Sequence, residues 1–192
     1  MWPFASPKTS LRQQKYADWF RCLDRTGDGS VDRDDFQAIV LTMTSALGWD
    51  AAESESRALR AAYMDLFDAL SAHLDEDGDG KIDLDEFVGF YSSLAADVER
   101  TGTVPRWALA QLRCLLESLD TDGDGAISVE EFGTYLRAVG SDAAAETAFR
   151  LLDENGDGLV SLTELESRFR EWLTSDDPSR PGNVLMTGRL PE

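Results

Sequence analysis

Four short acidic segments, each with the same spacing of oxygen-bearing side chains and glycine, constrain the fold of this chain more than any other feature. The segment DEDGDGKIDLDE, which begins at Asp75, has carboxylates at positions 1, 3, 5, 9 and 12 and Gly80 at position 6. Carboxylates this close repel one another, so the segment needs a positive charge in order to fold compactly. A hard cation with six to eight oxygen ligands supplies that charge, and Ca²⁺ suits the spacing best.

Each position of the segment has its own role around such a cation. Positions 1, 3 and 5 provide one side-chain oxygen each, position 7 its backbone carbonyl, and position 12 both carboxylate oxygens. Position 9 usually acts through water, and glycine at position 6 allows the sharp turn. The candidate ligands are Asp24, Thr26, Asp28, Ser30, Asp32 and Asp35 in loop one; Asp75, Asp77, Asp79, Lys81 and Glu86 in loop two; Asp120, Asp122, Asp124, Ala126 and Glu131 in loop three; and Asp153, Asn155, Asp157, Leu159 and Glu164 in loop four.

This spacing is the calcium-loop motif of an EF-hand, and three of the four copies match it in full. Loop one departs from it, because position 3 is Thr26 and position 12 is Asp35. From average residue usage, one full match in a chain of this size is expected by chance about once in a few thousand sequences. Three matches therefore indicate binding loops rather than solvated acidic turns. Lys81, at position 7 of loop two, uses only its carbonyl, so we expect its side chain to point to solvent.

Apolar residues at helical spacing precede each loop. Counted back from position 1, the residues one, four, five and eight places earlier are mostly apolar, which is the stripe of one helix face. The stripes are Tyr16, Trp19, Phe20 and Leu23; Phe67, Leu70 and Leu74; Leu112, Leu115, Leu116 and Leu119; and Ala145, Ala148, Phe149 and Leu152. Position 9 also has the character of a helix N-cap. The sequence predicts an all-α fold of four EF-hands in two pairs, with short antiparallel β pairing between loops.

The spacing between loops predicts the domain organisation. Loops three and four are 33 positions apart, whereas loops one and two are 51 apart and enclose a long helix, roughly 51–74. Gly102 and Pro105 mark a linker and a helix start. We expect an N-terminal pair in residues 1–98 with loops 24–35 and 75–86, a linker at 99–106, a C-terminal pair in 107–173 with loops 120–131 and 153–164, and a tail at 174–192 that packs on the core.

Charge and composition restrict the partners. Asp and Glu number 37 against 18 Lys and Arg, so a net charge of −19 repels nucleic acids and anionic membranes. No apolar run approaches the ~18 residues of a membrane span. The start, MWPFASPKTSLRQQ, lacks the plan of a signal peptide, and Trp2 in place of glycine excludes myristoylation. Cys22 and Cys114 are expected to be helix-face thiols rather than a disulfide. We expect a cytoplasmic monomer.

The whole pattern resembles the sarcoplasmic calcium-binding protein family, and its calerythrin-like bacterial branch in particular. The features that carry the resemblance are four hands, a stretched first pair, an aromatic-rich first helix and a tail containing DPSRPGNVL. The resemblance implies a compact helical cytosolic protein that buffers or transports calcium, with the tail folded over the core between the two halves. The fully formed second loop departs from the family pattern, in which one hand is often degenerate.

A calcium buffer is therefore our leading functional prediction, and a sensor is the alternative. A sensor exposes an apolar groove, often rich in methionine, to regulate a protein target, and this chain has only Met1, Met43, Met64 and Met186. Photoproteins share the architecture but use several histidines around a chromophore, whereas this chain has only His73. Without a phosphate loop or a nucleophile-and-base arrangement, we predict that the chain is no enzyme.

We expect Ca²⁺ at three to four sites, with loops two, three and four the strongest. Loop one is expected to be a mixed Ca²⁺ and Mg²⁺ site, because Asp35 is one methylene shorter than glutamate and Thr26 offers a neutral oxygen. Asp32 is a candidate for direct binding there. In the tail, Pro178 and Pro181 prevent a continuing helix, and we hypothesise that residues 184–186 pack against apolar helix faces.

Overall fold

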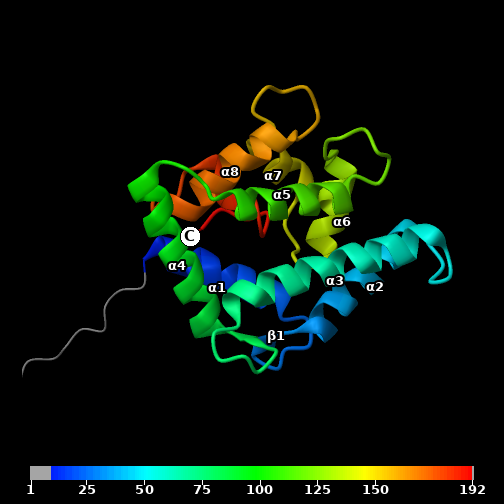
Figure 1. Cartoon of the computed structure of the whole chain (residues 1–192). Helices are drawn as coiled ribbons and strands as arrows, with labels where there is room; N and C mark the ends of the chain where they lie inside the picture. The colour runs from blue at the N-terminus through cyan, green and yellow to red at the C-terminus, as the bar shows by residue number, and fades with distance from the viewer. Residues whose placement is uncertain (1–9, 192) are drawn as a thin grey trace, which may run out of the picture.

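The computed structural model of the protein describes residues 10–191; residues 1–9 and 192, and with them most of the stretch examined for a signal peptide, lie outside the described part. The described chain forms eight α-helices, two short strands and a 3₁₀-helix (Figure 1). Their bounds are α1 Leu11–Leu23, β1 Ser30–Val31, α2 Arg33–Leu47, α3 Ser54–Leu74, β2 Ile82–Asp83, α4 Leu84–Thr101, α5 Arg106–Leu119, α6 Val129–Ala138, α7 Ala145–Leu152, α8 Leu162–Thr174 and η1 Pro181–Val184. The predicted all-α fold of four helix–loop–helix units is confirmed.

The four loops meet in two pairs through the residue at position 8. β1 and β2 pair antiparallel with Val31 opposite Ile82, which joins loops one and two. Ile127 and Val160 form an isolated antiparallel bridge between loops three and four, with two N–H···O distances of 3.0 and 2.8 Å. All four side chains are buried, so each pairing also closes the core beneath its loops. Figure 1 shows the two pairs of loops at opposite ends of the molecule.

Two helix boundaries differ from the sequence prediction for local reasons. α3 begins at Ser54 rather than near residue 51, because the Asp50 carboxylate accepts the Ala52 N–H at 2.9 Å and folds this segment into a turn. α4 continues to Thr101 and ends at Gly102, whose φ of 72° is left-handed. The connection between α4 and α5 is therefore shorter than the linker predicted at 99–106.

Aromatic rings from both halves of the chain meet at the centre of the core. Trp19 of α1 lies edge-on to Trp172 of α8 and to Tyr91 of α4, with ring centroids 5.3 and 5.4 Å apart. The hydroxyl of Tyr16 donates to the Leu173 carbonyl at the end of α8. Because α1 and α4 belong to the first pair and α8 to the second, these contacts join the two pairs into one core.

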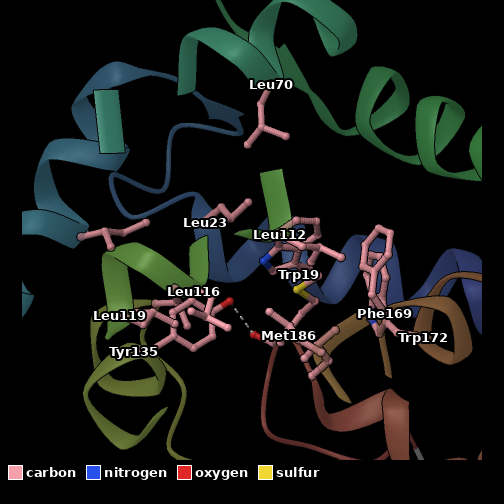
Figure 2. Packing of buried hydrophobic residues seen from close by; sticks show 14 of the residues in the cluster. Trp19, Leu23, Leu70, Leu112, Leu116, Leu119, Tyr135, Phe169, Trp172 and Met186 are labelled. Carbon is pink, nitrogen blue, oxygen red and sulfur yellow. Dashed lines mark hydrogen bonds between the residues drawn. The ribbon is translucent and has the colours of Figure 1, made fainter. Parts of the chain in front are cut away.

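The tail after α8 lies against this core. Val184, Leu185 and Met186 are 1%, 5% and 2% exposed, whereas Leu190 is 46% exposed. Figure 2 shows Met186 beside Trp19 and Tyr135, and the Tyr135 hydroxyl donates to the Met186 carbonyl at 3.1 Å. Met186 thus reaches residues of both pairs, whereas Leu185 lies among second-pair residues such as Leu112 and Val160. None of the described helices is both long enough and apolar enough to cross a membrane.

Candidate metal centre

The carboxylate at position 1 organises each loop before any cation is considered. Asp24, Asp75, Asp120 and Asp153 each accept the N–H of the glycine at position 4 at 2.7 Å, and the N–H of the glycine at position 6 at 2.8–3.0 Å. Both glycines have positive φ in every loop. Sequence reasoning assigned a role only to position 6. The recurrence of glycine at position 4, in Gly27, Gly78, Gly123 and Gly156, was the signal for the second turn.

The carboxylate at position 5 uses one of its oxygens to hold the backbone of its own loop. In each loop its Oδ1 accepts the N–H of position 7 at 2.8–3.0 Å, as Asp79 does from Lys81 and Asp124 does from Ala126. This bond is an Asx-type turn that holds the backbone of the loop. The other oxygen, Oδ2, is the candidate ligand; it accepts the Lys81 ammonium in loop one and the Asn155 amide in loop four.

Position 12 ties each loop to its exiting helix. Both carboxylate oxygens of Glu86 accept backbone N–H groups, from Glu76 at 2.9 Å and from Asp83 at 2.8 Å. Glu131 and Glu164 do the same in loops three and four and also accept the hydroxyls of Ser128 and Ser161. With position 9 as the N-cap these bonds form capping boxes, as the sequence indicated. The glutamate at position 12, which is the candidate bidentate ligand, is thus already held in place by the protein's own hydrogen bonds.

Loop one has the same bonds with a shorter side chain. Asp35 accepts the N–H groups of Thr26 and Asp32, both at 2.8 Å, and is completely buried. The bond of Asp35 reaches position 3, whereas Glu86 and Glu131 reach position 2 and Glu164 reaches both positions. The position-12 carboxylate of loop one is therefore placed differently relative to the other candidate ligands.

The donor set suits a hard cation such as Ca²⁺. Three carboxylates come within 4.8 Å of one another in loop two, at Asp75, Asp77 and Glu86, and in loop three, at Asp120, Asp122 and Asp124. Across residues 10–191 no third group of this kind is found, so loops one and four do not reach the same convergence of acidic groups. In loop four part of the difference is Asn155, whose neutral amide replaces a carboxylate and donates to Asp157 at 3.0 Å.

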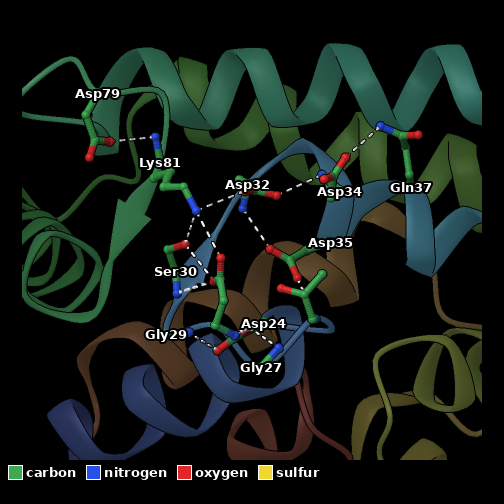
Figure 3. A network of polar contacts seen from close by, with 12 residues as sticks. Asp24, Gly27, Gly29, Ser30, Asp32, Asp34, Asp35, Gln37, Asp79 and Lys81 are labelled. Carbon is green, nitrogen blue, oxygen red and sulfur yellow. Dashed lines mark hydrogen bonds and ion pairs between the residues drawn. The ribbon is translucent and has the colours of Figure 1, made fainter.

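The side chain of Lys81 is 45% exposed, but it contacts loop one rather than extending freely into solvent as expected from the sequence. Its ammonium crosses from loop two to loop one and lies 2.9 Å from Asp28 Oδ2, 3.0 Å from Ser30 Oγ and 3.4 Å from Asp32 Oδ2 (Figure 3). These three residues occupy positions 5, 7 and 9 of loop one. The pairing of β1 with β2 causes the crossing, because it places the two loops side by side.

Hydrogen bonds keep several candidate ligands ionised. Hydrogen bonds from Lys81 and Ser30 lower the pKa of Asp28 to about 2. Burial opposes ionisation of Glu131 and Glu164, but the hydrogen bonds from Ser128 and Thr121, and from Ser161 and the loop-four backbone, outweigh it and lower both pKa values. These carboxylates are therefore anionic at neutral pH, the state that a metal ligand requires.

Comparisons with known proteins agree with this geometry. Models of the EF-hand domain pair match residues 109–170 and 65–94, and an EF-hand model matches residues 17–41. The structure of a Streptomyces coelicolor calcium-binding protein is 31% identical, with a TM-score of 0.65, over 85% of this chain and 98% of that one. The chain belongs to the EF-hand family. This membership confirms the prediction that it is a calcium-binding protein and no enzyme.

Two further relatives place this EF-hand protein within the family. Calerythrin from Saccharopolyspora erythraea is 28% identical over 165 residues, which is 85% of this chain and 93% of calerythrin. A sarcoplasmic calcium-binding protein from amphioxus has the same fold, with a TM-score of 0.68 over 94% of this chain and 98% of that one, at 22% identity. The predicted resemblance to the calerythrin and sarcoplasmic calcium-binding protein type is confirmed.

Proposed function

We propose that this EF-hand protein is a cytoplasmic calcium buffer or transport protein that remains closed when it binds Ca²⁺. The observation that carries the proposal is the docked tail. Val184, Leu185 and Met186 are buried, with Leu185 in the apolar interior of the second pair and Met186 beside Trp19 of the first, where an apolar groove would otherwise face a target. A protein whose groove is filled by its own chain is suited to hold calcium rather than to capture a partner.

Opening the groove would carry a substantial free-energy cost. Burial of an apolar side chain of this size contributes roughly 1.5–3 kcal/mol, and three such side chains would be exposed. Hydrogen bonds also hold the tail, from Tyr135 to the Met186 carbonyl at 3.1 Å and from Ser141 to the Thr187 carbonyl at 2.6 Å. Calcium would have to favour the open form by more than this sum to drive the transition.

The proposed occupancy follows from the ligands at position 12. Glu86, Glu131 and Glu164 support Ca²⁺ in loops two, three and four, because glutamate can give both oxygens to a large ion. Asp35 and Thr26 support a mixed Ca²⁺ and Mg²⁺ site in loop one, because Mg²⁺ accepts a smaller shell with fewer protein ligands. Three to four ions per chain is the proposed capacity, and a monomer is the proposed state.

Truncation after Thr174 tests the closed-buffer proposal. The full-length chain is expected to bind at least three Ca²⁺ by calorimetry without a rise in fluorescence of a dye that binds exposed apolar surface. The shortened chain is expected to melt at a lower temperature and to gain calcium-dependent dye fluorescence, because its groove is no longer filled. A strong calcium-dependent rise in the full-length chain would contradict the proposal.

A calcium sensor is the second candidate, and one comparison favours it. The structure of the 31% identical Streptomyces coelicolor protein is described as a basis for prokaryotic calcium-mediated regulation. A sensor role for this chain would require that the tail leaves the core when calcium binds. The dye measurement on the full-length chain separates the two functions, because only a sensor exposes the surface under Leu185 and Met186.

A further inference from the structure

The pairing of loops one and two brings position 7 of each loop next to position 9 of the other. Ser30 lies opposite Asp83 and Val31 opposite Ile82, so the same register continues to Lys81 and Asp32. In the second pair, the bridge between Ile127 and Val160 sets Ala126 and Leu159 at the equivalent places. Of the four residues at position 7, only Lys81 carries a charge.

The Lys81 ammonium meets the oxygens that loop one has left for a cation. Asp28 Oδ1 accepts the N–H and the hydroxyl of Ser30, which leaves Oδ2, and that oxygen is 2.9 Å from Lys81 Nζ. Asp32 Oδ1 accepts the Asp34 N–H, and its Oδ2 is 3.4 Å from the same nitrogen. Figure 3 shows this ammonium beside Ser30 and Asp32 of loop one.

The other three loops differ from loop one in the contact between a cationic side chain and the position-5 carboxylate. Among the described residues, no lysine or arginine forms an ion pair with the position-5 carboxylates Asp79, Asp124 and Asp157. The cation contact is therefore a property of loop one, and it comes from a residue of the neighbouring hand rather than from loop one itself.

We propose that Lys81 is a tethered competitor of the divalent cation in loop one and thereby sets the affinity of that site. The inference rests on cation binding at loop one as proposed above. An entering Ca²⁺ must either displace the ammonium from Asp28 Oδ2 and Asp32 Oδ2 or share these oxygens with it, and each course opposes binding. Loop one therefore fills at higher Ca²⁺ than it would without Lys81. Because the carbonyl of Lys81 is also a candidate ligand of loop two, one residue links the two sites.

A site-resolved titration tests this proposal on the full chain. The backbone amide signals of Gly29, Gly125 and Gly158 in NMR report loops one, three and four separately, because each N–H donates to the position-1 carboxylate of its own loop. Ca²⁺ is added to the wild type, Lys81→Met and Lys81→Arg. Arg100→Met is the control, since it removes one charge from an exposed ion pair with Asp97 in the last turns of α4, far along the chain from the loop ligands.

In Lys81→Met the Ca²⁺ concentration at half-saturation of the Gly29 signal is expected to fall about three- to tenfold, while the Gly125 and Gly158 midpoints stay within twofold. Lys81→Arg and Arg100→Met are expected to leave the Gly29 midpoint within twofold of the wild type. An unchanged or raised Gly29 midpoint in Lys81→Met would overturn the role of Lys81 but leave loop one as a site. If the Gly29 signal responds to Ca²⁺ in neither the wild type nor Lys81→Met, both this proposal and the assignment of loop one as a cation site fail.

Discussion

At the scale of single residues, the side chain at position 12 distinguishes loop one from the others. Asp35 and Glu131 make the same type of bond to the loop backbone, but Asp35 is one methylene shorter. We predict that Asp35→Glu shifts loop one toward Ca²⁺ and that the reverse exchange, Glu131→Asp, shifts loop three toward Mg²⁺. Each shift is expected to be about tenfold, equivalent to about 1.4 kcal/mol. Ca²⁺ titration of the Gly29 and Gly125 amide signals in millimolar Mg²⁺ measures both, and unchanged midpoints would show that side-chain length does not set the preference.

At the scale of elements, the contact between η1 and α8 depends on a glycine with no room for a side chain. A Cβ on Gly182 would overlap the Arg168 carbonyl and come within 2.6 Å of Glu171 Cβ. We predict that Gly182→Ala destabilises the protein by about 1–3 kcal/mol, because η1 must move away from α8. Thermal unfolding measures the loss. The matched control is Gly89→Ala in α4, where a Cβ meets nothing within 4 Å and the change is expected to be neutral or stabilising. Equal melting temperatures for Gly182→Ala and wild type would mean that the tail is not tightly docked.

At the scale of the whole molecule, Lys15 joins the first helix to the tail. Its ammonium is buried and donates to the Ser175 carbonyl and to Asn183 Oδ1, both at 2.8 Å. Burial lowers the pKa of Lys15 to about 8, while in the unfolded chain it is near 10.5. Between these values the unfolded chain holds more protons, so stability rises with pH. The neutral amine still has two N–H groups for its two acceptors.

We therefore predict that the wild type gains stability relative to Lys15→Met as the pH rises from 7.5 to 10. The gain is expected to be on the order of 1 kcal/mol, because solvent screens part of the effect. Paired thermal melts across this range measure the difference, and Arg21→Met serves as a control that should show no such trend. A constant or falling difference would mean that the buried ammonium is not penalised in the folded state.

The sequence alone was sufficient for the loops and their order, because the geometry of a binding loop is set within twelve consecutive residues. The candidate ligand positions, the capping boxes at Ser128 and Ser161 and the apolar stripes all depend on neighbours along the chain. The same local signals located α3 and α4 but misplaced one end of each by a few residues. α3 begins later than predicted because Asp50 forms a turn before it, and α4 ends later, at Thr101.

Only the tertiary structure decided the contacts between residues far apart in the sequence. Strand pairing brings Lys81 and Asp28 together. The spacing of residues within either hand does not predict this contact, because the two residues belong to different hands. The close approach of Gly182 to α8 and the burial of Met186 beside Trp19 likewise depend on how the two pairs and the tail pack. The sequence shows that such side chains are charged, small or apolar. The packing of the whole chain determines which residues they contact, because each apolar surface is buried against another.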